Sequence, residues 1–173
     1  MRDIQEIFES ITERFENPTR IGSRCESKTF YRVEELDTED IATCGEYLTS
    51  RIIDVCQPVL PRYIIRLGGS YTELAEILKE NLETPTHPIE IISSDKIVPG
   101  NGVGNKLKGA HAILVNDVIT TARSCVEIHT KATMLGAIVM CWATLIDRTF
   151  GPGPVPVIAT ITGKPVTLLE ENL

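Results

Sequence analysis

One segment of the chain joins an apolar run to small polar side chains that suit phosphate and sugar chemistry. Residues 112–124 read Ala-Ile-Leu-Val-Asn-Asp-Val-Ile-Thr-Thr-Ala-Arg-Ser, a pattern that predicts a buried strand, a turn and the start of a helix. A helix N-terminus offers unpaired N–H groups and a partial positive charge, so the hydroxyls of Thr120, Thr121 and Ser124 are placed to help bind an anion. Asp117, at the end of the strand, is placed to accept hydrogen bonds from a sugar diol.

A bare Thr-Thr-x-x-Ser sequence is more often an ordinary helix start with threonine capping. The complete pattern of residues 112–124, however, resembles the signature with which type I phosphoribosyltransferases bind phosphoribosyl pyrophosphate (PRPP). The resemblance implies that Asp117, with Asn116 beside it, contacts the ribose hydroxyls. It also implies that the following loop holds the 5′-phosphate through Thr120, Thr121, Ala122, Arg123 and Ser124.

Other regions extend the resemblance to the orotate phosphoribosyltransferases in particular. Residues 23–31 are similar to the stretch of those enzymes that covers the base, with four positions in register: Ser23, Ser27, Phe30 and Tyr31. This assigns Phe30 and Tyr31 to a base site. Leu67-Gly68-Gly69 resembles the pyrophosphate loop of the family, in which Gly68 and Gly69 would bring backbone amides to the pyrophosphate.

Ile146-Asp147-Arg148 matches an Asp-Arg pair whose arginine contacts the orotate carboxylate in that family, so the resemblance places Arg148 in the base site. Plainer interpretations of these secondary matches stay open. Phe30 and Tyr31 would also suit a hydrophobic core, and Gly68-Gly69 a tight turn at the end of a strand. An Asp147-Arg148 dipeptide is more commonly a surface ion pair.

The sequence departs from the family where charge matters for catalysis. The family has two acids at the strand end, and here the first is Asn116. Residues 93–109 occupy the place of its mobile catalytic loop, and Lys96 keeps one basic position that would lend charge to the leaving pyrophosphate. Other family positions are changed, namely an Arg to Asp95, a Lys to Pro99, a His to Asn101 and a basic residue near the base to Glu26. Lys106 and Lys108 are the cations that could substitute.

The resemblance implies an enzyme that transfers the phosphoribosyl group from PRPP to orotate or a related base, releasing pyrophosphate, in pyrimidine nucleotide synthesis. Asp117 and Lys96 would be the catalytic residues. The resemblance implies Mg²⁺ carried by PRPP, with no direct protein ligand, and a homodimer whose loops reach into the partner's site. Two alternatives remain open. The altered loop and Asn116 would suit a non-catalytic protein that binds PRPP or a nucleotide, and Glu26 would suit an acceptor base less anionic than orotate.

Composition narrows the class of protein. The chain has 173 residues and a net charge of −7, which argues against broad nucleic-acid binding because phosphate backbones are bound mainly by excess Lys and Arg. The five cysteines show no C-x-x-C spacing and are interpreted as reduced, buried residues, with a catalytic cysteine as a minor alternative. No run approaches the ~20 apolar residues of a membrane helix. We therefore expect a soluble, cytoplasmic protein without nucleic-acid or membrane partners.

The elements that must position these residues alternate between helix and strand. Apolar spacing predicts helices over 3–16, 37–56, 70–82 and 123–135, and apolar runs predict strands over 29–33, 63–67, 89–92, 112–115, 137–145, 155–162 and 166–169. Residues 93–109 have no periodicity and predict a long loop. The strand runs do not alternate with polar residues, which favours an α/β fold with a mostly parallel sheet covered on both faces. Residues 1–36 would form an N-terminal helix and hood, and residues 37–173 the core of one compact domain.

Overall fold

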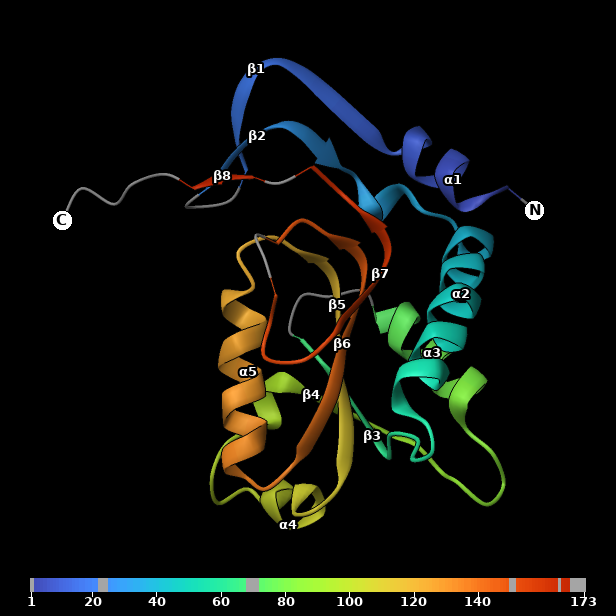
Figure 1. Ribbon diagram of the computed structural model, residues 1–173, viewed down its shortest axis with the longest axis vertical. Coiled ribbons are helices and arrows are strands. Elements are labelled where there is room, and N and C mark those ends of the chain that lie inside the picture. Colours follow the sequence, from blue (N-terminus) through green and yellow to red (C-terminus); the bar gives the residue numbers. More distant parts are fainter. Residues whose placement is uncertain (1, 22–24, 68–71, 150–151, 165, 169–173) are drawn as a thin grey trace, which may run out of the picture.

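The central feature is a parallel sheet of five strands in the order β4-β3-β5-β6-β7 (Figure 1). The computed structural model describes residues 2–21, 25–67, 72–149, 152–164 and 166–168. The strands are β3 Tyr63–Arg66, β4 Glu90–Ser93, β5 His111–Ile119, β6 Ile138–Asp147 and β7 Val157–Thr162. All four neighbouring pairs are parallel, which confirms the predicted fold class.

Helices cover both faces of this sheet. The helices α2 (Thr38–Cys56) and α3 (Thr72–Leu82) pack on one face, and α5 (Arg123–Met134) with the short α4 (Val103–Leu107) lies on the other (Figure 1). Along β5, Ile113 and Val115 belong to the core beneath α2 and α3, whereas Ala112 and Leu114 belong to the core beneath α5. Successive strand residues face opposite sides, so a strand buried on both faces has an uninterrupted apolar sequence.

A second, three-stranded antiparallel sheet lies across the end of the core where the parallel strands finish (Figure 1). It consists of β1 (Thr12–Ile21), β2 (Cys25–Tyr31) and β8 (Thr167–Leu168). We refer to these three strands as the upper sheet. Because β8 follows the last core strand, the upper sheet draws on both ends of the chain.

The predicted helix over 3–16 is wrong in its second half. Helix α1 spans Ile4–Ser10, where Asp3 and Glu6 form a capping box, and β1 begins at Thr12. Its residues pair with β2 from Thr12↔Tyr31 onward. This long-range pairing overrides the helical spacing of the apolar residues, because backbone hydrogen bonds to a neighbouring strand are invisible to local periodicity.

The predicted loop over 93–109 also needs correction. It contains a 3₁₀ turn at Ser94–Lys96 and the helix α4, and it is anchored by Ile97 and Leu107, which are 1% and 0% exposed. The other predicted elements are present with shifted ends: β5 continues through Asn116 and Asp117 to Ile119, and β8 joins the upper sheet. The predicted opening of helix 70–82 falls partly on residues outside those described.

Gly45 allows α2 and α3 to approach closely, and its replacement should destabilise the fold. A Cβ built on Gly45 would overlap with Ile77 Cγ2 on α3. We expect Gly45→Ala to lower the free energy of unfolding by about 1–3 kcal/mol, the usual cost of overpacking a core. Urea unfolding would measure this, with Ser50→Ala at an exposed position of α2 as the control. A variant as stable as the wild type would contradict the close packing of the two helices.

Candidate functional site

A cavity of about 350 Å³ at the carboxyl end of β5 brings together residues from distant parts of the chain. Five of the predicted site residues line it, namely Phe30, Tyr31, Asp117, Thr120 and Arg148. The other described residues of its wall are Ile21, Val33, Glu34 and Val118. The upper sheet therefore closes over the strand end, so the predicted ribose and base residues face one common space.

Asp117 is held in place near the end of β5 by two hydrogen bonds. The Val118 backbone N–H donates to its Oδ1 at 2.7 Å, and the Thr144 hydroxyl on β6 donates to its backbone carbonyl at 2.8 Å. Burial raises the pKa of the Asp117 carboxyl, the Val118 N–H opposes this, and the nearby negative charge of Glu34 raises it further. The carboxylate is thus held in one orientation, but its single hydrogen bond does not offset the cost of burying its negative charge. It is therefore suited to accept further hydrogen bonds from ligand hydroxyls.

The turn after β5 presents the N-terminus of α5. Ala122 takes a left-handed conformation (φ 57°) as the residue before the helix, and no side chain of the described residues caps this end. The first turn holds no acidic residue. Thr120, Thr121 and Ala122 line a second cavity of about 310 Å³ beside this turn. Free first-turn amides without a competing carboxylate can bind an anion such as a phosphate.

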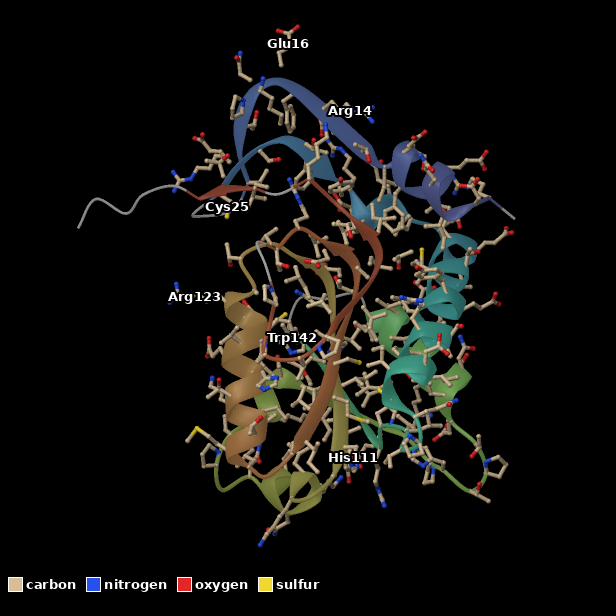
Figure 2. All side chains as sticks on the ribbon, viewed as in Figure 1. Arg14, Glu16, Cys25, His111, Arg123 and Trp142 are labelled. Carbon is tan, nitrogen blue, oxygen red and sulfur yellow. The ribbon has the colours of Figure 1, made fainter. Side chains whose placement is uncertain are left out.

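Three predicted phosphate and ribose residues lie elsewhere. Asn116 faces the opposite side of the sheet from Asp117, where with Ser124 it lines a separate cavity of about 270 Å³. Its side-chain amide donates to the Val118 carbonyl at 3.1 Å. Arg123 is exposed, and its side chain points away from the sheet (Figure 2). The structure therefore brings Asp117 and Thr120 together but not Asn116, Arg123 or Ser124 with them.

Arg148 is the buried cation of the site. Its residue is 2% exposed, its Nε donates to the Lys164 carbonyl at 2.7 Å, and its Nη2 donates to the Ser27 hydroxyl at 2.6 Å. Its guanidinium carbon lies 5.4 Å from the centre of the Tyr31 ring. Burial lowers the pKa of Arg148. These contacts exclude the interpretation of Asp147-Arg148 as a surface ion pair.

Close approach of the chain at Gly163 completes this arrangement. A Cβ added there would lie 2.9 Å from Arg148 Cγ and 3.1 Å from the Tyr31 hydroxyl oxygen. The Gly163 N–H donates to the Asp147 carbonyl at 2.7 Å. The absence of a side chain thus lets the segment after β7 pass directly against Arg148 and Tyr31.

The predicted loop cations do not gather at this site. Lys96 is exposed and is not among the described residues that line the three cavities above. Lys106 Nζ lies 2.5 Å from Glu90 Oε1, at the start of β4, and Lys108 packs against Gly136, which precedes β6. Both lysines lie near the amino ends of the parallel strands, whereas Asp117 lies near the carboxyl end of β5. Neither takes over the role of a loop cation.

The cysteines were predicted to be buried and reduced, with a catalytic cysteine as a minor alternative. All five cysteines are buried, and burial raises the pKa of Cys125 to about 12 and that of Cys44 to about 11. Thiols with such pKa values stay protonated near neutral pH and make poor nucleophiles. Gly68, Gly69 and Ser23 lie outside the described residues.

Sequence reasoning missed several residues of the cavity wall. Glu34 and Ile21 stand in no motif, and only the folding of the upper sheet brings them to Asp117. Thr144 carried a signal, because it is a hydroxyl inside the otherwise apolar run of β6, where it is 0% exposed. A buried polar residue in a core strand needs a hydrogen-bond partner, and here that partner is the carbonyl of Asp117.

No family model and no curated protein matches the sequence. Solved structures do resemble this one. The orotate phosphoribosyltransferase from Aeropyrum pernix is 16% identical with a TM-score of 0.64, covering 92% of each chain. The Mycobacterium tuberculosis H37Rv orotate phosphoribosyltransferase in complex with inorganic phosphate is 15% identical with a TM-score of 0.62, covering 92% of this chain and 93% of that chain. An HGPRT-ase from Leishmania tarentolae in complex with GMP is 14% identical with a TM-score of 0.55, and the match covers 75% of this chain and 80% of that chain.

The fold is that of the type I phosphoribosyltransferases. At these identities the likeness establishes the fold alone, because one fold can carry unrelated functions. In such open α/β folds, ligands bind outside the carboxyl ends of the strands, which is where the Asp117 cavity lies. Among the described helices, none has the length and apolar character needed to cross a membrane.

Proposed function

We propose that this protein transfers the phosphoribosyl group of PRPP to a nucleobase, with orotate as the first candidate, and releases pyrophosphate. The observation that carries this proposal is the shared cavity of Asp117, Thr120, Phe30, Tyr31 and Arg148. It joins a residue suited to ribose, a turn suited to phosphate, and aromatic and cationic residues suited to a planar, charged base. The named neighbours, which include orotate phosphoribosyltransferases, support the same class.

The proposed reaction breaks the bond between C1′ and the pyrophosphate oxygen, which keeps the electron pair, and forms a bond between C1′ and a base nitrogen. Asp117 would hold the ribose hydroxyls in place, and the amides at the start of α5 would hold the 5′-phosphate. Phe30 and Tyr31 would pack on the base, and Arg148 would face its anionic group. The residues thus act mainly by positioning the two reacting groups.

Magnesium fits this site as a companion of PRPP. The described residues contain no group of three or more His, Cys, Asp or Glu side chains that could hold a metal by themselves. Two carboxylates, Asp117 and Glu34, line the cavity, and Mg²⁺ is commonly held by one or two carboxylates together with substrate phosphates and waters. When bound there, the ion would neutralise charge on the leaving pyrophosphate.

The charges of the cavity wall bear on which acceptor base binds. The cavity wall carries one guanidinium, Arg148, and two carboxylates, Asp117 and Glu34. Glu26, the acid singled out from the sequence, pairs with Thr167 in the upper sheet and is not among the described residues of the cavity wall. Orotate would be attracted by Arg148 and opposed by Glu34, so a less anionic base is the natural comparison. A homodimer and a role in pyrimidine synthesis in the cytoplasm belong to the same proposal.

One observation favours a second candidate, a protein that binds PRPP or a nucleotide without turning it over. The segment that should supply loop cations is anchored by the buried side chains of Ile97 and Leu107. Its Lys106 pairs with Glu90 at the amino end of β4, away from Asp117. Losing one transition-state donor typically costs a hundredfold or more in rate, roughly 3–4 kcal/mol. The phosphate and ribose contacts do not depend on that segment.

Two measurements on the same protein test these candidates. The first is pyrophosphate release with PRPP, Mg²⁺ and either orotate or uracil, and the second is PRPP binding by calorimetry. We expect release with orotate that depends on both substrates. Binding without release with either base would favour the second candidate. Absence of both binding and release would contradict both. The double variant Thr120→Val, Thr121→Val removes hydroxyls from the phosphate turn while preserving side-chain shape, and it should weaken PRPP binding and slow release.

A further inference from the structure

A further cavity of the described structure lies outside the site described so far. It has a volume of about 620 Å³ and lies between the upper sheet and α1 on one side and α2 and β7 on the other. Tyr31 is the one residue that it shares with the Asp117 cavity among the described lining residues. The upper sheet therefore covers two separate spaces, one on each side of Tyr31. We call the larger one the α1 cavity.

An unsatisfied hydroxyl lies in the wall of the α1 cavity. Thr160 on β7 is 7% exposed, and its Oγ1 has no hydrogen-bond partner of ordinary geometry among the described residues. The Cys44 thiol lies near it, but a thiol is a weak hydrogen-bonding group. Buried polar side chains are nearly always paired, so this enclosed hydroxyl, which has only a thiol beside it, would be satisfied better by a hydrogen-bonding group of a ligand in the cavity.

The cations and the carboxylates of the α1 cavity come from different elements of its wall. Arg14 on β1 and Lys164 after β7 supply two cations, and neither forms an ion pair within the described part of the chain (Figure 2 shows Arg14 on β1). Asp3 and Glu9 supply two carboxylates from the region of α1. Tyr47 on α2, 39% exposed, adds an aromatic surface to the wall. A ligand that matches this wall carries an anionic group, hydroxyls and a flat ring with N–H donors.

The α1 cavity is connected to the substrate cavity through two contacts. The backbone carbonyl of Lys164 accepts the hydrogen bond from Arg148 Nε at 2.7 Å, and the Tyr31 ring lies against the Arg148 guanidinium. A molecule that moves Lys164 or Tyr31 would therefore move the cation assigned to the base. Two sites coupled in this way change each other's affinity by the same factor.

We propose that the α1 cavity is a second binding site, which takes a nucleoside monophosphate. Its phosphate would bind to Arg14 and Lys164, its ribose hydroxyls would reach Thr160, and its base would pack on Tyr47. Control of acceptor binding through Tyr31 and Arg148 rests on the proposed function, whereas binding in the α1 cavity does not.

The probe is adenosine 5′-monophosphate (AMP), added at millimolar concentration to the complete chain. Hydrogen–deuterium exchange should show protection in peptides that cover residues 3–14 and 157–164. The double variant Arg14→Gln, Lys164→Gln should bind AMP about tenfold or more weakly, because charge-assisted phosphate contacts are lost. Thr160→Val should weaken binding by a smaller factor. Arg20→Gln, which removes a cation of β1 outside the cavity, is the matched control and should bind as the wild type does.

Three results would overturn the proposal. These are no AMP binding at millimolar concentration, equal binding by the double variant and Arg20→Gln, and protection confined to residues 117–126 with loss of binding in Thr120→Val, Thr121→Val. The last result would place AMP in the substrate site and would leave the proposed function standing. Conversely, a protein that binds no PRPP but shows AMP protection at 3–14 and 157–164 would retain the second site without the proposed function.

Discussion

Replacement of Asp117 by asparagine is expected to weaken PRPP binding by about tenfold or more, since hydrogen bonds to a charged acceptor contribute about 1.5–3 kcal/mol. Asparagine keeps an oxygen for the Val118 N–H and nearly the same volume, so the turn at the end of β5 should persist. What disappears is the negative charge that would receive the ribose hydroxyls. Calorimetric titration of PRPP with Mg²⁺ measures the change.

The same variant should be at least as stable as the wild type near neutral pH. Because burial and Glu34 raise the pKa of Asp117 in the folded protein, its ionised form is favoured in the unfolded chain. The charge therefore opposes folding fully above the raised pKa of the folded protein. The opposition fades as the pH falls from there toward the ordinary carboxyl pKa, about 3.9, and is absent below that value. Asp117→Asn removes this opposition. Urea unfolding at neutral and acidic pH should show a stability gain only at neutral pH.

The raised pKa also predicts how PRPP binding depends on pH. Protonation of Asp117 removes the charged acceptor, so affinity in the wild type should fall as the pH falls through the raised pKa, earlier than for an ordinary aspartate. Asp117→Asn should lack this component. Asn116→Ala is the matched control, because its side chain faces another cavity and should affect PRPP less. Equal PRPP affinity in Asp117→Asn and the wild type would show that the ribose role is wrong.

The parts of the structure that were predictable are those whose signal is local. The apolar runs of β3 and β5 indicated buried parallel strands because each has residues packed on both faces. Asp37 caps α2 through the N–H of Asp40, which the sequence pattern indicated. The polar pair after an uninterrupted apolar run placed Asp117 close to the end of β5, although the strand continues two residues further, to Ile119.

The parts that were not predictable depend on contacts between distant residues. Thr12 begins a strand because β2 is available as its partner, and nothing in residues 3–16 records that partner. Ile97 and Leu107 anchor the segment after β4 as single apolar residues in a polar context, which periodicity does not detect. Glu34 reaches the cavity because a 3₁₀ turn follows β2. Each case concerns how the upper sheet or the anchored segment folds back on the core.

Replacement of Arg148 by methionine should selectively impair the anionic base. The KM for orotate, or the dissociation constant if turnover is absent, should rise about tenfold to a hundredfold, the cost of losing one charge-assisted pair. PRPP affinity should change much less, because Asp117 and the α5 N-terminus do not contact the guanidinium in the described structure. Methionine fills a similar length, but Ser27 and the Lys164 carbonyl lose their donor, so some loss of stability should accompany the change.

A structural role for Arg148 predicts a different pattern from a binding role. If the guanidinium only ties Ser27 and Lys164 together, Arg148→Met should weaken orotate and the uncharged base uracil equally. If it faces the carboxylate, orotate should lose more than uracil. Arg148→Lys should then restore part of the orotate affinity through its charge, although an ammonium cannot reproduce the two fixed donors that reach Ser27 and Lys164. Equal losses for both bases would remove Arg148 from the base site and leave it as a support for the upper sheet.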